Sequence, residues 1–482
     1  MSEQTRIIAG PFNRVEGDLE IRLDIEDGAV VDAYANSPLF RGFEQMLSGK
    51  DPRDAMTITP RICGICSISQ SAAAARAIAA AQGLTPTEAG AKTAALIHGT
   101  ENVADHLTHF HLFFMPDFAK PVYENEPWHG TLVERFSAME GSAARAAVAA
   151  RTELMHLMGL LAGKWPHTLA IQPGGVTKAP DARDRVRLIS ILRTFRTYLE
   201  KTMFGDSLET FSALKSTCEL EDWRKRGSGG DVRLFLDVAD AVGLNDMGRG
   251  PNQFMSYGAY ETADGYLFKR GMMLDGRERD IAFDRIDEDT AYAWMTGDAA
   301  HPFEGRTTPD LDMSEPAYSW CKAPRLDGRP VEVGALARQI VDGHPLAREL
   351  GQGGASALGR VIGRLLEIAR TVPALEAWAT GIEPGVAYLR RGEPLLDGQG
   401  AGLVEAARGS LGHWLVAKDG RIANYQIIAP TTWNFSPRDA GGVPGPVEQA
   451  LRGAVVRQGE TTPISVQHIV RSFDPCMVCT VH

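Results

Sequence analysis

The amino-acid sequence predicts an α+β fold that is predominantly helical, a single large body with a long-helix core and small peripheral β-sheets. Long alanine- and leucine-rich stretches with helical periodicity occupy the middle of the chain, and short stretches of alternating apolar residues lie near both ends. Two Cys-x-x-Cys pairs also lie near opposite ends of the 482 residues. If both pairs belong to one site, residues 1–482 fold as one domain.

The first elements are a β-hairpin and a series of long helices. In the N-terminal region, 1–40, apolar and polar residues alternate from Ile21 to Ile25 before an Asp27-Gly28 turn, which predicts a hairpin. Thr85 or Thr87 is expected to cap a helix. The further helices of the core are predicted over 69–82, 132–161, 181–204 and, as a pair, within 345–378.

The helical core within 41–400 is interrupted, and strands return at the C-terminal end. Glycine, proline and aspartate are frequent over 227–316, which predicts an irregular or small-sheet segment. The C-terminal region, 401–482, contains two apolar runs around a turn at 418–420 and then the second cysteine pair. These runs predict a strand pair.

Charge and hydropathy exclude two classes of partner. The formal net charge is −11 and lysine and arginine form no block, so a nucleic-acid partner is not expected. The most apolar long stretch, 144–163, contains Arg145, Arg151 and Glu153, and the N-terminus has no apolar signal segment. Direct membrane insertion is therefore not expected.

The two cysteine pairs predict a metal site. They share the spacing that lets two sulfurs face one metal, and they are Cys63 with Cys66 and Cys476 with Cys479. Thiolates are soft ligands that select zinc, copper(I), iron–sulfur clusters or nickel. Spacing alone leaves structural zinc, one iron–sulfur cluster or two separate half-sites open, although a loop of about 410 residues is longer than zinc ribbons use. Cys218 and Cys321 are expected to be buried free thiols.

The sequence around both pairs resembles the large subunit of nickel–iron hydrogenases. The motifs are Arg61-Ile-Cys63-Gly-Ile-Cys66 and Asp474-Pro-Cys476-Met-Val-Cys479-Thr-Val-His482. Further matching blocks extend the resemblance from about residue 8 to residue 482, and they include Arg14-Val-Glu16-Gly17, Phe40-Arg-Gly-Phe-Glu44, Asp105-His106, 318–325, 408–414 and 430–434.

The resemblance implies a nickel–iron centre that cleaves dihydrogen heterolytically. Cys63 and Cys476 would be terminal ligands of nickel, while Cys66 and Cys479 would also bridge to an iron that carries carbon monoxide and cyanide. Cys476 would accept the proton, and Glu16 would pass it on. Without the resemblance, Glu16 would be interpreted as a solvated loop carboxylate.

The resemblance assigns roles to the surroundings of the centre as well. Arg408, Asp105 and Asp474 would line the open face of the metals, with Arg408 and Thr431 donating to the cyanides. On the sequence alone, Arg408 would be a surface salt bridge.

A second metal and several protein partners are also implied. Glu44, His482 and the carbonyl of Ile427 would bind Mg²⁺, with water in the remaining positions. The electrons need iron–sulfur clusters in a separate small subunit, because the two remaining cysteines cannot hold them. Maturation proteins are further expected partners.

Several positions depart from the family's usual pattern. Gln70 stands where many members have histidine, Ala407 where proline is usual, and Asp18 where histidine is usual. Ile65 and Phe113 replace a smaller valine and leucine, and we expect both to narrow an apolar gas channel. The chain ends at His482, without the usual short C-terminal extension.

These departures resemble the regulatory subgroup, which senses dihydrogen, turns over slowly and signals to a histidine kinase in the cytoplasm. The alternative is an energy-yielding uptake hydrogenase in its processed form. A scaffold that has lost its metal is disfavoured because all four cysteines are present. A structural zinc protein is the remaining alternative.

Overall fold

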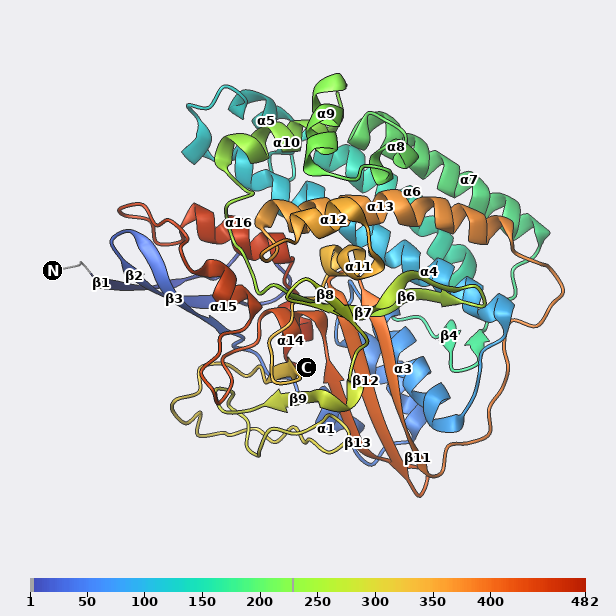
Figure 1. The fold of residues 1–482 in the computed structure, drawn as a ribbon. Coiled ribbons are helices and arrows are strands. Elements are labelled where there is room, and N and C mark those ends of the chain that lie inside the picture. Colours follow the sequence, from blue (N-terminus) through green and yellow to red (C-terminus); the bar gives the residue numbers. More distant parts are fainter. Residues whose placement is uncertain (1–3, 228) are drawn as a thin grey trace.

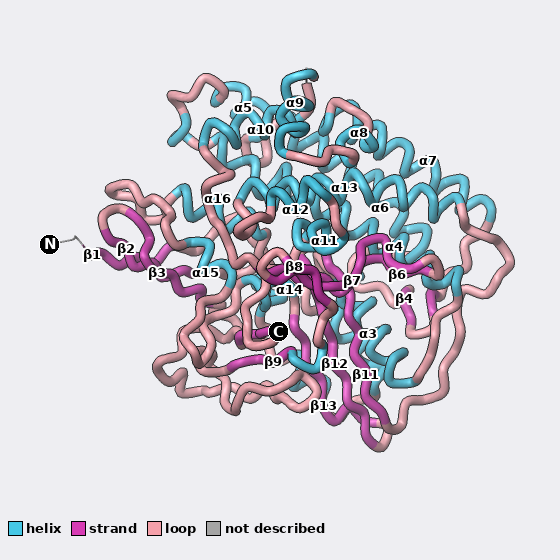
Figure 2. The backbone as a smooth tube through the Cα atoms, viewed as in Figure 1, coloured by secondary structure: helices cyan, strands magenta, loops and turns pink. Residues whose placement is uncertain are grey.

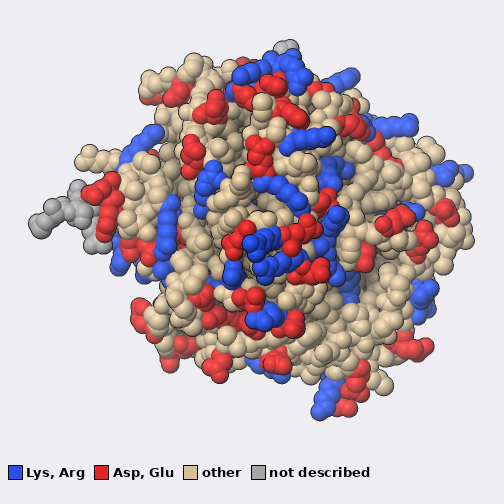
Figure 3. Space-filling view, viewed as in Figure 1, with Lys and Arg blue, Asp and Glu red and all other residues tan. Residues whose placement is uncertain are grey.

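The computed structural model describes residues 4–227 and 229–482. A layer of long helices covers one side of the molecule, and short antiparallel sheets with long loops form the other side (Figures 1 and 2). Among the described residues, no helix is long and apolar enough to cross a bilayer. On the face drawn in Figure 3, acidic and basic side chains are interspersed.

Four long helices form the helical layer. α4 (Glu88–Thr108) packs against α6 (Ser142–Ala162) and α13 (Ala357–Thr380), and α7 (Ala182–Tyr198) packs against α6 and α13. Leucines and phenylalanines from these helices fill the largest hydrophobic core. Shorter helices extend this side of the molecule: α5 (His129–Phe136), α8 (Leu208–Ser212), α9 (Thr217–Arg226), α10 (Asp231–Val242) and α12 (Pro345–Leu350).

Side-chain caps fix the starts of two long helices. Thr87 caps α4 by accepting a hydrogen bond from the Gly90 amide, as predicted. Asp181 caps α7 in a capping box. The prediction of one helix over 132–161 is wrong, because the chain breaks between α5 and α6. Met139 adopts a positive φ of 68° there, and a Cβ at Gly141 would lie 2.4 Å from a backbone carbonyl oxygen.

A three-stranded meander packs on the helix that follows the first cysteine pair. Its strands are β11 (Gly398–Ala406), β12 (Gly409–Lys418) and β13 (Arg421–Ile428), and α3 (Ser67–Gln82) lies across them. The approach is close because small residues face each other. A Cβ at Gly402 would lie 1.8 Å from the Ala73 carbonyl oxygen. The alanine-rich composition of α3 therefore seats its N-terminus, at Cys66, beside the sheet.

The N-terminal hairpin is confirmed. β1 (Gln4–Ala9), β2 (Glu20–Glu26) and β3 (Ala29–Asn36) form an antiparallel sheet, and Asp27 and Gly28 both adopt positive φ in the turn. α15 (Pro446–Leu451) packs on β3 and on α16 (Ile464–Phe473). The last residues of the chain thus pack beside the first.

The small sheet predicted within 227–316 is confirmed, whereas the helix α10 in this segment was not predicted. The segment contains α10 and a long hairpin of β6 (Gln253–Thr262) and β7 (Gly265–Leu274), and only its second half is mainly loop. The remaining elements are short: α1 (Phe43–Leu47), α2 (Ala55–Ile58), α11 (Ala335–Asp342), α14 (Pro430–Asn434), α17 (Met477–Thr480), β4 (Ile171–Gln172), β5 (Gly175–Val176), β8 (Arg277–Arg279), β9 (Ile286–Asp289) and β10 (Ala323–Leu326).

Candidate metal centre

The two cysteine pairs meet in one buried cluster. The Sγ atoms of Cys63 and Cys476 lie 3.5 Å apart, those of Cys66 and Cys479 lie 3.2 Å apart, and those of Cys476 and Cys479 lie 3.1 Å apart. All four are free thiols and are buried. Cys66 is the N-cap of α3, and Cys476 is the N-cap of α17, so two helix starts present the sulfurs to each other.

The sulfur separations fit a shared metal. Two sulfurs at about 2.3 Å from one ion and about 90° apart would lie roughly 3.3 Å from each other. The distances in the cluster fall close to that value, and Cys63, Cys66 and Cys479 alone form a three-sulfur group that can hold an ion. Hydrogen bonds from the other thiols hold the pKa of Cys63 well below its ordinary value, while those that Cys66 donates raise the pKa of Cys66.

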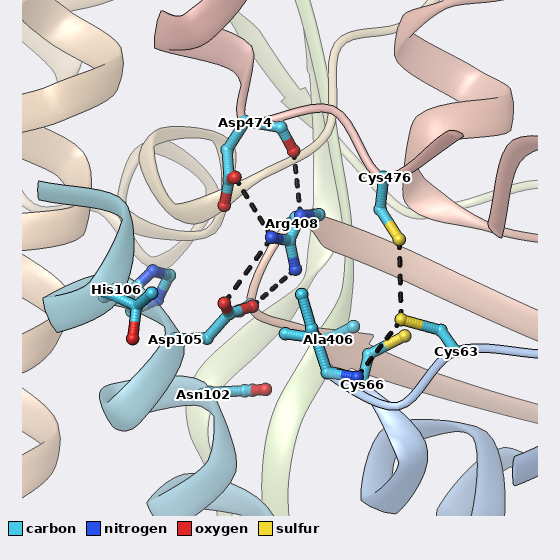
Figure 4. Close-up of polar contacts among 12 residues, drawn as sticks. Cys63, Cys66, Asn102, Asp105, His106, Ala406, Arg408, Asp474 and Cys476 are labelled. Carbon is cyan, nitrogen blue, oxygen red and sulfur yellow. Dashed lines mark hydrogen bonds and ion pairs between the residues drawn. The ribbon is translucent and has the colours of Figure 1, made fainter. Parts of the chain in front are cut away.

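Arg408 lies beside the sulfurs between two buried carboxylates (Figure 4). Its Nη1 donates to Asp105 at 2.5 Å, its Nη2 donates to the Asp474 carboxylate at 3.0 Å, and its Nε donates to the Asp474 carbonyl at 2.8 Å. The guanidinium is 3% exposed, so the surface salt bridge is excluded. Burial opposes its charge, but Asp105 and Asp474 raise the pKa of Arg408 well above its ordinary value.

The pKa values of the two carboxylates are shifted in opposite directions. Burial raises the pKa of Asp105 to about 7, with Arg408 opposing the shift. Burial also disfavours the charge of Asp474, but Arg408 and the nearby His109 hold the pKa of Asp474 below its ordinary value. Asp474 adopts a positive φ of 59° where α16 ends, which turns the chain toward Cys476.

Glu16 lies in a loop that runs alongside the second cysteine pair. Its carbonyl accepts from the Met477 amide at 2.6 Å, and a bridge pairs Glu16 with Cys476. Gly17 permits this approach, because a Cβ there would lie 3.0 Å from the Val478 side chain. Partial burial and then the negative charge of Cys63 raise the pKa of Glu16. A freely solvated carboxylate is therefore excluded.

Thr431 supports the same segment from α14. Its hydroxyl accepts a hydrogen bond from the Cys476 amide at 3.1 Å, and the side chain is 2% exposed. A hydroxyl that accepts still has its own proton to donate. Thr431 thus contacts the segment that carries Cys476, and its role as a donor to cyanide stays a prediction.

The three predicted magnesium ligands also meet. The Glu44 carboxylate accepts from the Ile427 amide at 2.7 Å and lies 3.3 Å from Nε2 of His482. Although burial opposes its charge, Lys322 and His482 lower the pKa of Glu44 to about 2. These residues line a cavity of about 20 Å³, which has room for one small ion or water.

The lining of this cavity fits a cation. Glu288 is a second carboxylate in this lining, and one of its two oxygens is buried with no hydrogen-bond partner among the described residues. Its other oxygen accepts from Lys322 at 2.7 Å. Two carboxylates against one ammonium group leave one negative charge, which would attract a cation.

Of the residues that depart from the family's usual pattern, Ile65 contacts one of the sulfurs, and Gln70 and Phe113 have other neighbours. The Ile65 amide donates to Sγ of Cys63 at 3.3 Å, and Gln70 Oε1 lies 2.8 Å from Nε2 of His413. Phe113 is half-buried on the π-helical turn η3 (His109–Phe114) that follows α4. A gas channel past Ile65 and Phe113 stays a prediction.

Sequence reasoning missed two kinds of residue. Cys218 is exposed, so its predicted burial is wrong, whereas Cys321 is buried as predicted. Arg338 and Glu367 form a fully buried ion pair behind Arg408 that was not singled out. Glu367 lies between Leu366 and Ile368 in an apolar helix, and such a charge on a core-facing position was the available signal.

Comparisons with known proteins agree with this geometry. The nickel-dependent hydrogenase family matches residues 41–126 and 145–482. The chain is 31% identical to the periplasmic NiFeSe hydrogenase large subunit of Desulfomicrobium baculatum, covering 99% of this chain and 95% of that protein. It is 27% identical to the hydrogenase-2 large chain of Escherichia coli, covering 99% and 97%.

Solved structures show the same fold. A reduced, active form of the Ni-Fe-Se hydrogenase from Desulfomicrobium baculatum matches with a TM-score of 0.87 and 29% identity, covering 99% of this chain and all of that one. The family match thus covers most of the sequence, and membership of this family explains why four cysteines that are distant in the sequence meet in one buried cluster. The chain belongs to the nickel-dependent hydrogenase family, as a large subunit that activates dihydrogen at a nickel–iron centre held by its cysteines.

Proposed function

We propose that this chain cleaves dihydrogen heterolytically as part of a heterodimer and that its role is to sense hydrogen at a low turnover. The observation that carries the catalytic part is the convergence of four buried sulfurs beside Arg408 and Glu16. Nickel, and iron bearing carbon monoxide and cyanide, would supply the electrophilic centre that polarises dihydrogen.

The residues around the sulfurs provide the proton path. The thiolate of Cys476 accepts the proton, and Glu16 lies next along the paired backbone. A carboxylate whose pKa is raised toward neutrality both takes and releases a proton readily. The loop that bears Glu16 is only partly buried, so it connects the cluster with the surface of the chain.

Arg408 and Thr431 shape the open face. The guanidinium is fixed by four hydrogen bonds and keeps its charge, so it stabilises negative charge and orients anionic groups in a buried site. Thr431 adds a neutral hydroxyl donor on the other side. Mg²⁺ would be held by Glu44, His482 and the Ile427 carbonyl. Bound there, it would stabilise the segment that carries Cys476 and Cys479.

The sensing role is supported by residues around the cluster. Gln70 replaces a titratable imidazole with a neutral amide, and it pairs with His413 rather than with a charged group. Ile65 and Phe113 enlarge two apolar side chains, and in a close-packed interior one added methylene or ring obstructs a passage. Both features suit a cluster that only small gases reach and that turns over slowly.

A second candidate is energy-yielding uptake of hydrogen. The chain is 25% identical to the uptake hydrogenase large subunit of Rhodobacter capsulatus over 99% of its length. In either role, a small subunit with iron–sulfur clusters would carry the electrons, because one cluster needs about four cysteines and only Cys218 and Cys321 remain outside the centre. For the sensor, the setting would be cytoplasmic, and the partners would also include a histidine kinase and maturation proteins.

Infrared spectroscopy of the purified heterodimer tests the catalytic proposal. Stretching bands of metal-bound carbon monoxide and cyanide are expected, together with nickel, and iron should exceed nickel because the clusters of the small subunit also contain iron. A protein with zinc alone and no such bands would refute it. Turnover then separates the roles: a sensor exchanges deuterium with water readily but reduces dyes slowly, whereas fast dye reduction favours uptake.

A further inference from the structure

A second buried charge network lies behind Arg408 and has no place in the proton path. Arg338 on α11 and Glu367 on α13 are both fully buried. The guanidinium meets the carboxylate with two hydrogen bonds of 2.8 Å, and its Nη1 also donates to Glu405 at 2.7 Å. A buried guanidinium with several acceptors holds them in defined positions, because each of its N–H groups points in a fixed direction.

Two donors of this guanidinium hold the turn that presents Arg408. Arg338 donates from Nη1 to the Ala406 carbonyl at 2.9 Å and from Nη2 to the Ala407 carbonyl at 3.0 Å. Ala406 pairs with Gly409, so Ala407 and Arg408 form a two-residue hairpin turn. Neither of them has a positive φ, so this turn is not one of the primed types that match strand twist. The turn therefore depends on outside contacts.

The same network also reaches the helix that bears Asp105. Glu367 Oε1 lies 3.1 Å from Nε2 of His106, the residue after Asp105 on α4. Figure 4 shows Ala406 and His106 on the two elements that flank the Arg408–Asp105 pair. The Arg338–Glu367 pair thus contacts both segments that carry the Arg408–Asp105 ion pair.

We propose that Arg338, supported by Glu367, is a positioning residue that sets the orientation of the Arg408 guanidinium toward the sulfur cluster. This inference rests on the proposed dihydrogen cleavage at that cluster. Arg338 touches no reacting atom and acts through the Ala406–Arg408 turn. Because alanine at position 407 does not fix φ, the hydrogen bonds from Arg338 supply the restraint that the covalent chain lacks.

The test uses Arg338→Lys and Ala407→Pro in the purified heterodimer. Lysine keeps the charge but lacks the planar guanidinium, so it loses contacts to two carbonyls. Proline is favoured at the first central position of a type I or II turn, and it restores the restraint on φ covalently. Arg233→Lys is the matched control, because Arg233 is buried and donates to four carbonyls near α10 without contacting the Arg408 turn.

Arg338→Lys is expected to lower kcat more than tenfold and to shift or broaden the cyanide bands, with nickel and iron content retained. Arg233→Lys should leave the bands unchanged. Adding Ala407→Pro to Arg338→Lys should restore the bands and most of the activity, but not the lost thermal stability. A purely structural role for Arg338 would give no such rescue.

If Arg338→Lys does not yield metal-loaded protein, Glu367→Gln replaces it, since the amide keeps the volume but loses one acceptor. The same band shift and the same rescue by proline are expected. Unchanged bands in the substituted protein, or a shift that proline does not reverse, would overturn the positioning role. Absence of the bands from the wild-type heterodimer would instead refute the proposed function.

Discussion

Glu448 makes the stability of this protein depend on pH in a predictable direction. Its carboxyl on α15 is fully buried, and one oxygen accepts from the Ala35 amide at 2.9 Å and from the Tyr318 hydroxyl at 2.7 Å. The other oxygen is buried without a hydrogen-bond partner among the described residues. Burial raises the pKa of Glu448 from 4.5 to about 7, although the hydrogen bonds oppose the shift.

The shift sets the size and sign of the effect. Above pH 4.5 the unfolded chain loses this proton, while the folded protein keeps it up to about pH 7. The contribution of the protonated carboxyl to stability is therefore complete below pH 4.5 and is lost as the pH rises through 7. A difference of about 2.5 pKa units corresponds to about 3 kcal/mol in the free energy of unfolding.

Glu448→Gln should remove this dependence, because the amide resembles the protonated acid. Relative to wild type, the variant should have a similar free energy of unfolding at pH 4.5 and a higher one, by up to about 3 kcal/mol, at pH 8. Urea unfolding followed by circular dichroism at pH 5, 6, 7 and 8 measures the difference. Glu88→Gln is the control, because that side chain is 70% exposed. A difference that stays constant with pH would refute the reasoning.

Three further experiments test the metal centre, the proton path and the gas channel. Cys479→Ser should abolish loading of nickel and iron, measured by mass spectrometry, while Cys321→Ser should leave it intact; equal metal content in both would contradict a shared site. Glu16→Gln should slow exchange of deuterium from D₂ with water by roughly 10²-fold or more, without changing the infrared bands. Replacing Ile65 by Val and Phe113 by Leu together should increase inhibition by oxygen, and unchanged inhibition would remove the channel argument.

Local signals predicted the elements that depend on local chemistry. The Asp27-Gly28 turn and the Thr87 cap formed as expected, because turn and cap residues satisfy the backbone within a few positions. The break between α5 and α6 was not predicted, since its cause is the backbone approach at Gly141, which apolar periodicity does not report.

The candidate site likewise contains residues that the sequence predicted and residues that it did not. Motif resemblance located the four cysteines together with Arg408, and the structure brings them together. The buried partners Arg338 and Lys322 were not predicted as supports, because their acceptors come from segments that are distant in the sequence. Which buried charges pair is decided by tertiary packing, so spacing along the chain carries little information about it.

Cys476 lies 413 positions after Cys63, and this separation imposes an order on biosynthesis. Translation at about 5–20 residues per second exposes the early thiols for roughly 20–80 s before the late ones exist. Joining the ends of so long a loop then costs about 5 kcal/mol of chain entropy, which surrounding structure must offset. Ribosome-bound intermediates therefore hold only half of the ligand set until the segment with Cys476 and Cys479 has been made.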